Sequence, residues 1–407
     1  MSLPVSEGRR LRVLHVIANL DPHHGGPPAA ITGMCLALAR RGHTVTIATT
    51  DDYEGGHSHQ PGEALGEEVA VQYFPIQWPR RYGLSLPMVE GLRRLIPDFD
   101  LVHIHSLYLF HTLVTGHWCR ALGVPYVVRP HGTLDPYLRR RSRLKKTVYN
   151  WLVERRNLDH AAAVHYTSAD ERDLVALLGF KAPAVVVPLG IDLREFDDLP
   201  QPGMFRRRHP ALLDKTLIVF LGRLTPKKGL DLLAKAFGEV RRVVPQAHLV
   251  IAGPDDEGYG RQVRKFLADS GVDGHTTLLG MVAGREKLEL LRDTDVWVLP
   301  SYTENFGLAV VEAMASGLPL VISNRVNIWN HIAAREAGLV VDCDASQVSQ
   351  AICRVLREPD LGRRLAANAL SLARTEFSWA AVGAQLEQVY YDLLQPPVLS
   401  HAPVYAL

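Results

Sequence analysis

The fold is decided by a strand, loop and helix pattern in residues 296–313, which reads Val296-Trp297-Val298-Leu299-Pro300-Ser301-Tyr302-Thr303-Glu304-Asn305-Phe306-Gly307-Leu308-Ala309-Val310-Val311-Glu312-Ala313. A short apolar run, a polar loop and an apolar stretch of helical length are typical of one step in an α/β sheet. The same step recurs along most of the chain. We therefore predict right-handed β-α-β units and parallel sheets.

The predicted strands form two series, separated by a proline- and arginine-rich stretch at 199–208. Domain boundaries tend to fall in such polar segments with little periodicity. The first series is 13–18, 44–48, 69–74, 101–105, 126–128, 163–166 and 184–187; the second is 217–221, 248–252, 276–279, 296–299, 320–322 and 339–341. We predict two doubly wound domains at residues 1–200 and 201–377, a last amphipathic helix at 378–395 and a fraying tail at 396–407.

Composition narrows the class of protein. A length of 407 residues, 47% of them hydrophobic, favours two domains with a core each. A net charge of +2 gives no reason to expect a nucleic-acid partner. The longest apolar runs, such as Leu217–Leu221, are far shorter than the roughly 20 residues of a membrane span, and the N-terminus lacks a signal core. Four widely spaced cysteines indicate buried thiols rather than disulfides or a zinc site, so we expect a cytoplasmic protein.

Two carboxylates stand out in the 296–313 stretch, Glu304 and Glu312. Ligands of open parallel sheets bind beyond the carboxyl ends of the strands, and two such domains facing each other predict a cleft between them. If the intervening residues are helical throughout, the two carboxylates lie roughly 12 Å apart along the axis. That is too far to share one glycosidic bond, for which the carboxyls are at most about 9.5 Å apart. The spacing suits the two ends of an elongated polar ligand.

The same loop offers backbone donors. Amides of Phe306, Gly307 and Leu308 at a helix N-terminus would hold an anionic group between the carboxylates. Glu312 is surrounded by apolar neighbours, so its charge requires a partner or a ligand. Glu304 has a simpler alternative interpretation, a favourable charge near a helix N-terminus.

Basic residues follow the first strand of the second series. Arg223 and Lys228 flank the loop after residues 217–221, where they are placed to grip a diphosphate. The alternative is that both are merely solvated. In the first series, Gly25 and Gly26 lie between a strand and a helix, where the backbone can approach an anion closely or simply make a tight loop. His131, at the end of residues 126–128, is placed at a cleft edge, although a lone histidine is more often structural.

Several residue patterns resemble metal-binding motifs, but we do not interpret them as metal sites. Asp293 with Asp295, and Asp342 with Asp344, are interpreted as caps or turns. His103 and His105 point to the same side of a strand and can ligate a metal, but no third ligand is suggested, so we favour packing or cleft lining. We therefore expect no metal site.

The stretch 138–156 is strongly basic and carries an apolar stripe at helical spacing. Such a helix can dock on an anionic membrane, each basic residue contributing on the order of 1 kcal/mol. The alternative is that the stripe packs on its own domain while the charges face water. The residues assigned to a membrane or acceptor side are Arg139, Arg140, Arg141, Arg143, Lys145, Lys146 and Trp151.

Taken together, the chain resembles the family-four retaining glycosyltransferases, which have the GT-B fold: two doubly wound Rossmann-like domains facing a cleft, with a C-terminal helix crossing back to the first domain. The resemblance covers nearly the whole chain. It rests on Gly25-Gly26, Pro130-His131-Gly132, Gly222-Arg223-Leu224 with Lys227-Lys228-Gly229, Gly253-Pro254, Leu299-Pro300-Ser301, the E-x7-E spacing of Glu304 and Glu312, and Phe377-Ser378-Trp379.

The resemblance implies transfer of a hexosyl unit from a nucleotide sugar, a UDP- or GDP-hexose, to a glycan or polyprenyl-linked acceptor. It implies front-face attack without a metal or other cofactor. By analogy, Arg223 and Lys228 bind the diphosphate, Glu312 the ribose and Glu304 the donor sugar. The remaining contacts are implied for the backbone of Asn305, Phe306, Gly307 and Leu308, and for Gly25, Gly26 and His131.

Other interpretations stay open at this point. Many relatives have Asn where this chain has Leu189, which leaves the linker contacts undefined. A nucleotide-sugar-binding scaffold without transfer activity, or a sugar-nucleotide epimerase on the same fold, are the alternatives. A surface-polysaccharide pathway and a peripheral place on the inner face of the cell membrane are further expectations.

Overall fold

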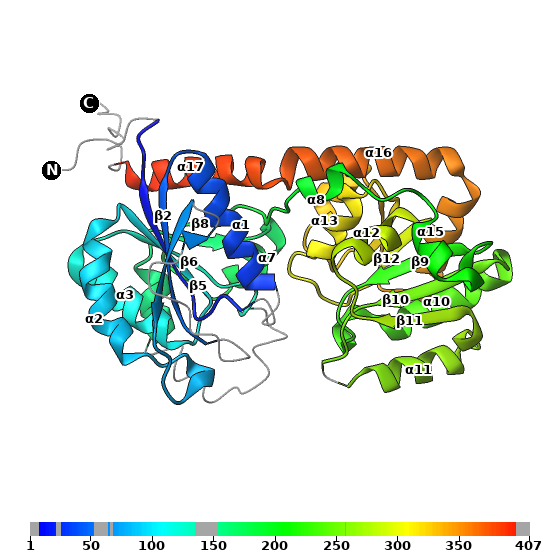
Figure 1. Cartoon of the computed structure of the whole chain (residues 1–407), viewed down its shortest axis with the longest axis horizontal. Helices are drawn as coiled ribbons and strands as arrows, with labels where there is room; N and C mark the ends of the chain where they lie inside the picture. Colours follow the sequence, from blue (N-terminus) through cyan, green and yellow to red (C-terminus); the bar gives the residue numbers. More distant parts are fainter. Residues whose placement is uncertain are drawn as a thin grey trace, which may run out of the picture. The chain divides into compact units, whose positions relative to one another are not determined.

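The computed structural model describes residues 8–21, 26–52, 64–65, 68–134, 153–256 and 258–395. The chain divides into two compact units (Figure 1). Unit 1 comprises Met1–Val187 together with Val382–Leu407, and unit 2 comprises Pro188–Ala381. Each unit is built around its own sheet.

Unit 1 contains an eight-stranded sheet in the order β3-β4-β2-β1-β5-β6-β7-β8. Its strands are β1 (Arg12–Val16), β2 (Thr44–Thr50), β3 (Ala64–Leu65), β4 (Val69–Phe74), β5 (Leu101–His105), β6 (Tyr126–Arg129), β7 (Ala163–Tyr166) and β8 (Ala184–Val186). All neighbours pair in parallel except β3 and β4, which are antiparallel. The seven predicted strands are confirmed within two residues at each end, and only the two-residue β3 was missed.

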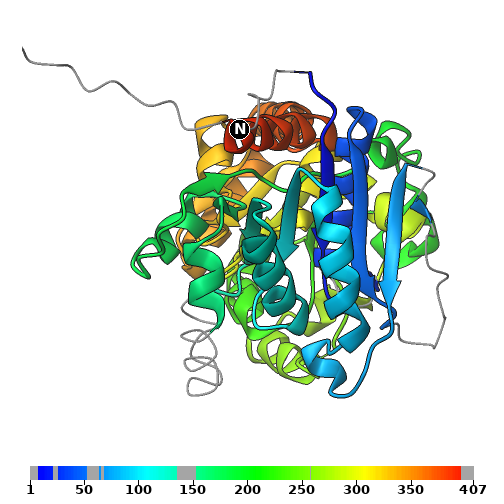
Figure 2. The ribbon, with the colours of Figure 1, turned by 90° about the vertical axis from the view of Figure 1, so that its left-hand side faces the viewer.

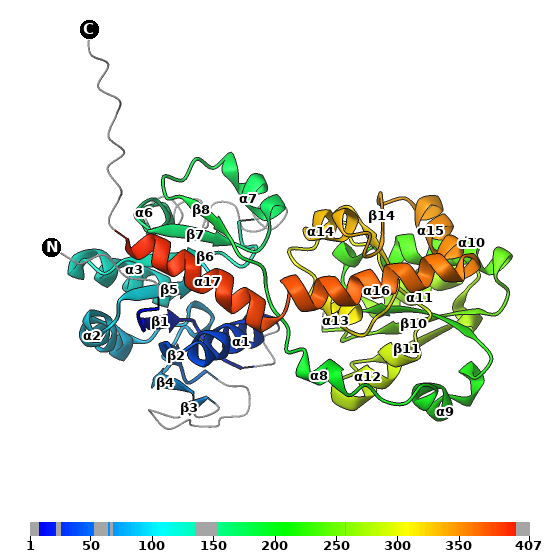
Figure 3. The same cartoon turned by 90° about the horizontal axis from the view of Figure 1, so that it is seen from above.

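The helices of unit 1 cover both faces of this sheet. They are α1 (Gly26–Arg40), α2 (Leu86–Leu95), α3 (Phe110–Leu122), α6 (Arg155–Asp159), α7 (Ala169–Ala176) and most of α17 (Trp379–Leu394), with short 3-10 turns at Arg80–Tyr82 and Ile96–Asp98. Figure 3 shows α2 and α3 on one face and α1 with α17 on the other, and in Figure 2 the α2–α3 region lies in front of the strands.

The two faces of the sheet of unit 1 differ in chemistry. On the α2–α3 side, alternate strand residues such as Leu14, Val102, Ile104 and Val128 form a continuous apolar core. Because side chains alternate along a strand, the intervening residues point to the opposite face. There α17 packs closely on α1: a Cβ at Gly383 would lie 3.0 Å from the Ala37 Cβ.

Unit 2 contains a six-stranded, all-parallel sheet in the order β11-β10-β9-β12-β13-β14. Its strands are β9 (Thr216–Leu221), β10 (Ala247–Ala252), β11 (Thr276–Gly280), β12 (Val296–Leu299), β13 (Leu320–Ser323) and β14 (Leu339–Val341). All six predicted strands are confirmed within one residue at each end. The doubly wound order, with β9 and β12 as central neighbours, places the loops after these two strands at the same edge.

The helices of unit 2 are α8 (Arg194–Asp197), α9 (Met204–Arg208), α10 (Leu230–Val243), α11 (Gly260–Asp269), α12 (Gly284–Arg292), α13 (Leu308–Ala315), α14 (Trp329–Ala334), α15 (Ala345–Arg357) and α16 (Pro359–Glu376). Short 3-10 turns lie at Pro210–Leu212, Pro226–Lys228 and Asp273–His275. Helix α10 packs against α11 and α15, and α13 packs against α16. The chain passes back to unit 1 within α17, whose first residues belong to unit 2.

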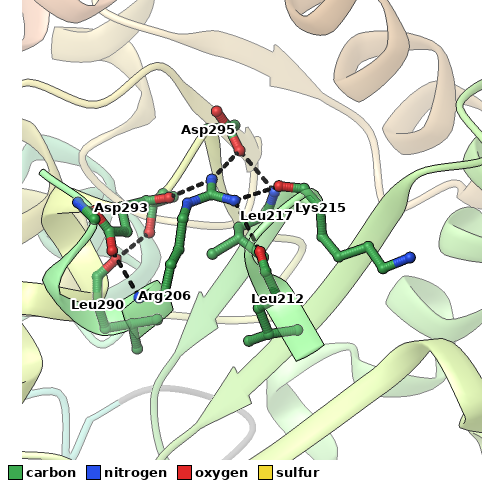
Figure 4. Close-up of polar contacts among 9 residues, drawn as sticks. Arg206, Leu212, Lys215, Leu217, Leu290, Asp293 and Asp295 are labelled. Atoms are coloured by element: carbon green, nitrogen blue, oxygen red, sulfur yellow. Dashed lines mark hydrogen bonds and ion pairs between the residues drawn. The ribbon is translucent and has the colours of Figure 1, made fainter. Parts of the chain in front are cut away.

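The Asp-x-Asp pairs are structural, as predicted. Asp293 ends α12 and accepts hydrogen bonds from the backbone N–H of Gly203 and of Arg206. Asp295 accepts from the Arg206 guanidinium at 2.9 Å and from the Leu217 N–H at 2.7 Å, so this network anchors α9 to the start of β9 (Figure 4). In the second pair, Asp344 caps α15 through the Gln347 N–H at 2.9 Å. Its other member, Asp342, accepts from the side-chain amides of Asn324 at 2.6 Å and Gln347 at 3.2 Å.

The four cysteines are free thiols, as predicted; Cys35, Cys119 and Cys353 are buried, whereas Cys343 is only partly buried. Within the described residues, no helix has the length and apolar character needed to cross a membrane.

Candidate functional site

The loops that carry Lys228 and Glu304 meet at the carboxyl edge of β9 and β12. Gly229 has a φ of +66°, and a Cβ on it would lie 2.1 Å from the Pro300 carbonyl oxygen, so only glycine allows this approach. The Tyr302 N–H donates to the Lys227 carbonyl at 2.8 Å. The juxtaposition of the two loops is therefore built into the backbone.

Lys228 and Glu304 form an ion pair at this edge. Both side chains are largely shielded, with 11% and 14% of their surfaces exposed. Burial acts to raise the pKa of Glu304, but the positive charges of Lys228, Lys227 and Arg223 outweigh it, so the pKa is lowered and Glu304 is a carboxylate at neutral pH. The result is a concentrated positive potential around one fixed negative charge.

The backbone of Glu304 is held from a second side. Its N–H donates to the Arg325 carbonyl at 2.9 Å, and its carbonyl accepts from the Asn327 N–H at 3.0 Å. Glu304 and Val326 thereby form an isolated parallel bridge. The loop after β13 was missed from the sequence, because nothing in its residue types marks it as a support.

The helix that was predicted to begin near Glu304 begins four residues later. α13 starts at Leu308, with Gly307 at a φ of +83° as its N-terminal cap. Glu304 therefore lies in the loop, and the roughly 12 Å separation derived for a continuous helix does not apply. Phe306 is buried against Phe377, with ring centroids 5.6 Å apart, and this contact fixes the loop between the two carboxylates.

Glu312 has the partner that its apolar surroundings required. Lys287 of α12 places its Nζ 2.8 Å from Glu312 Oε1, and both side chains remain partly exposed. Lys287 was not singled out from the sequence. Its signal was its position on a polar helix face that follows β11, which only the tertiary fold places beside α13.

In unit 1, His131 lies at the carboxyl edge of β6 in a strained conformation with a φ of +53°. The Gly132 N–H beside it donates to Glu171 Oε1 at 2.9 Å. Ser168 is the N-cap of α7 and accepts a hydrogen bond from the Glu171 N–H at 3.1 Å. The Glu171 carboxylate, however, turns to Gly132 and Thr167, so it supports the His131 loop rather than the Ser168 N–H.

A row of histidines crosses the face of the sheet that carries α1 and α17. The register aligns His15 with His103, and His105 with Arg129, so these residues share one face. His15 Nδ1 lies 3.0 Å from His105 Nε2, and His105 Nδ1 lies 3.1 Å from His131 Nε2. The sequence suggested no third ligand beside His103 and His105, but the structure brings His15 to them: the ligand atoms of His15, His103 and His105 all lie within 4.8 Å of one another.

Comparison with known sequences identifies the family of this chain. Residues 204–371 match the family described as Glycosyl transferases group 1, and residues 25–190 match the Glycosyl transferase 4-like domain. A GDP-mannose-dependent alpha-(1-6)-phosphatidylinositol monomannoside mannosyltransferase of Mycobacterium tuberculosis (strain CDC 1551 / Oshkosh) is 30% identical, over 92% of this chain and 97% of its own. The chain belongs to the group 1 glycosyltransferases.

Other similarities agree with this glycosyltransferase assignment. A D-inositol 3-phosphate glycosyltransferase of Paenarthrobacter aurescens (strain TC1) is 27% identical over 90% of this chain and 93% of its own. The crystal structure of Anabaena HepE in complex with UDP superposes with a TM-score of 0.74, at 18% identity, over 94% of this chain and 100% of that chain. The fold is thus GT-B, and the protein is an enzyme, a hexosyltransferase.

The residues predicted for the site fall into three groups. Lys228 and Glu304 are in contact, with Arg223 close enough to act on Glu304, and Glu312 lies in the following helix. His131 belongs to the edge of unit 1, where Gly26 begins α1. Outside the described residues lie Gly25 and the basic stretch, Arg139, Arg140, Arg141, Arg143, Lys145, Lys146 and Trp151.

Proposed function

We propose that this enzyme transfers a hexosyl unit from a UDP- or GDP-hexose to a hydroxyl group of a glycan or polyprenyl-linked acceptor, with retention of configuration and without a metal. The observation that carries the proposal is the shielded Lys228–Glu304 pair, with Arg223 beside it, at the carboxyl edge of the two central strands of unit 2. This edge is where ligands of doubly wound sheets bind.

The cations supply the electrostatic part of the reaction. Lys228 has three N–H donors, so it can hold Glu304 and a phosphate oxygen together. Arg223 is exposed and offers a planar fork for the other phosphate. As the bond to the donor sugar breaks, negative charge grows on the departing diphosphate. Fixed cations at this place stabilise that charge, which is the role a metal has in other transferases.

The carboxylates supply the recognition of hydroxyl groups. Glu304, held ionised by its cationic neighbours, is an acceptor for the hydroxyls of the donor sugar. Glu312, held by Lys287, is an acceptor for the two hydroxyls of the ribose. Backbone N–H groups from Asn305 to Leu308 are proposed to complete the grip on the diphosphate.

The reaction proposed is a front-face displacement. The acceptor hydroxyl attacks the anomeric carbon from the side of the leaving group and passes its proton to the departing phosphate oxygen. No enzyme nucleophile is needed, and His131 is assigned to the orientation of donor and acceptor. The names of the relatives support the donor class: GDP-mannose for the mycobacterial mannosyltransferase and UDP for HepE.

The acceptor class rests on two observations. The mycobacterial relative is named for a phosphatidylinositol mannoside acceptor. The chain itself has the basic stretch at 138–156, suited to an anionic membrane surface. We therefore infer surface-glycan synthesis at the inner face of the membrane, with peripheral attachment.

The test is incubation of the protein with a panel of UDP- and GDP-hexoses and a membrane extract, following nucleotide release and the glycosylated product. The expected result is release coupled to a product with the anomeric configuration of the donor. Nucleotide binding without product would contradict the proposal in favour of a scaffold. An isomerised donor without an acceptor product would favour an epimerase, and a product of inverted configuration would refute retention.

A further inference from the structure

Arg129 is a buried cation that the proposed reaction leaves without a role. It is the last residue of β6, with none of its surface exposed, and none of its three guanidinium nitrogens has a hydrogen-bond partner within the described part of the chain. Burying an ionised group without a partner costs several kcal/mol. Such a group requires a specific explanation, and a bound ion is among the usual ones.

The described neighbours of Arg129 give its guanidinium no hydrogen bond. The carboxylate of Glu171 acts on it by its charge, but both Glu171 oxygens accept hydrogen bonds from Gly132 and Thr167. The other neighbours are Tyr390 and histidines, and His15 Nε2 is also buried without a partner. Among the described residues, this face therefore holds a positive charge surrounded by neutral rings.

These neighbours select an anion rather than a metal. The histidine trio has the spacing of a metal site, but a divalent cation there would lie close to a guanidinium that no carboxylate of the described residues hydrogen-bonds. At short range in a protein interior, such repulsion amounts to several kcal/mol. An anion is attracted by the same guanidinium, and the unpartnered Nε2 of His15 can carry a proton and donate to it.

We propose that Arg129, with the histidines around it, binds an oxyanion of the phosphate class at the carboxyl edge of β5 and β6. The planar guanidinium matches two oxygens of a phosphate. The edge is the ligand side of the sheet, and Ser106, Tyr108 and His131, all non-glycine residues with positive φ, lie there. The acceptor of this enzyme would then carry a phosphate group, an inference that rests on the proposed function; inorganic phosphate is the other source of the same chemistry.

The test uses full-length protein with Arg223→Gln and Lys228→Met, so that the diphosphate site of unit 2 no longer binds anions. The probes are inorganic phosphate, glucose 6-phosphate and, as the matched neutral control, glucose. The readouts are the Tm and the dissociation constant by calorimetry. In this background both phosphate probes are expected to raise the Tm, glucose is not, and Arg129→Met is expected to weaken phosphate binding at least tenfold.

A second arm separates binding from structural support. Because Arg129→Met removes an unpartnered buried charge, the Tm in phosphate-free buffer is expected to stay equal or rise, whereas the exposed-site control Arg93→Gln leaves phosphate binding unchanged. A lower Tm with an unchanged phosphate response would overturn the proposal. If Arg129→Met does not fold, Arg129→Lys keeps the charge without the fork; phosphate binding weakened at least threefold supports the site, and unaltered binding refutes it.

The affinities for glucose 6-phosphate and for inorganic phosphate distinguish a phosphate-bearing acceptor from free phosphate as the ligand. Tighter binding of glucose 6-phosphate than of inorganic phosphate, by tenfold or more, supports a phosphate-bearing acceptor. Equal binding overturns the acceptor assignment. Because the donor site is disabled in this background, these outcomes are independent of whether the parent enzyme binds and uses a nucleotide sugar, which the donor panel decides.

Discussion

The carboxyl edges of the two sheets differ in how their titratable side chains are charged. In unit 2, Lys228 is paired with Glu304 and Lys287 with Glu312. In unit 1, burial and the nearby Arg129 charge lower the pKa of His15 to about 3, and similar causes lower the pKa values of His103, His105 and His165 well below the usual range. The edge of unit 2 thus contains ion pairs, whereas the buried histidines of unit 1 are neutral. We therefore expect acid pH to destabilise mainly unit 1, and substitutions of the paired charges to affect mainly unit 2.

The largest expected effect is acid unfolding of unit 1. Its fully buried histidines, His15, His103, His105, His111 and His165, are neutral in the folded state and titrate near 6.5 when unfolded. Below pH 6.5 the unfolded chain binds protons that the folded chain does not, so stability is greatest above that pH and is lost as the pH falls towards 3–4. Each histidine contributes up to about 1.4 kcal/mol per pH unit in this range, so the five together make unit 1 much less stable at pH 5 than at pH 7.

Segment-resolved hydrogen exchange at pH 7 and pH 5, corrected for the intrinsic rate, measures this loss. Peptides of β1, β5 and β7 should lose protection at pH 5 while those of β9 and β12 keep it. Equal loss of protection in both units would refute the contrast between the two edges.

Next in size is the substitution Lys228→Met. It removes the charge proposed to stabilise the departing diphosphate and leaves Glu304 without its ion-pair partner. Loss of one such contact to a transition-state charge lowers kcat by about 10²–10³-fold. Initial rates of nucleotide release measure the effect. The control is Lys235→Met, an exposed lysine of α10, which should leave the rate within about twofold; a similar rate for both variants would separate Lys228 from the chemistry.

Gly229→Ala tests the contact between the two loops of unit 2. The added Cβ would meet the Pro300 carbonyl at 2.1 Å in a conformation with positive φ. Strain of this kind costs about 1–3 kcal/mol, measured by urea unfolding of the variant. At Gly274 the added Cβ meets nothing within 4 Å, so Gly274→Ala is the matched control. If both alanine variants unfold at the same urea concentration, the close approach at Gly229 is not what holds the loops.

The smallest expected effect is that of Lys287→Met. The Lys287–Glu312 pair is partly exposed, and such pairs are worth about 1 kcal/mol or less. The donor KM is therefore expected to rise up to about fivefold, with kcat little changed, because Glu312 is assigned to ribose binding and not to the transition state. Arg285→Gln, on the same helix but paired with Glu289, serves as the control. A fall in kcat with KM unchanged would contradict the assignment of Glu312.

Much of this structure could be predicted from the sequence. Strand runs such as Val69–Phe74 and Val296–Leu299 are confirmed at both ends, because buried parallel strands are continuous apolar runs bounded by turn residues. The meeting of Lys228 with Glu304 was predictable for the same reason, since both follow strands that end at one edge.

The rest depended on information that is not local. The start of α13 at Leu308 is set by Gly307 and by the pairing of Glu304 with the loop after β13, neither of which a periodicity can show. His15 joined His103 and His105 only through the register between β1 and β5. Lys287 and Arg129 were missed because an ion pair between helices, and a buried charge without one, both require tertiary coordinates.

The most direct test of the central claim is the transfer rate of Glu304→Gln, measured with the donor that the panel identifies, alongside the affinity for its nucleoside diphosphate. The substituted amide would keep the shape of the side chain but lose the charge that pairs with Lys228 and that is proposed to accept hydrogen bonds from the donor sugar. We predict a loss of transfer of about 100-fold or more, with the affinity for the nucleoside diphosphate within about threefold of the parent. Full transfer by this variant would contradict the account.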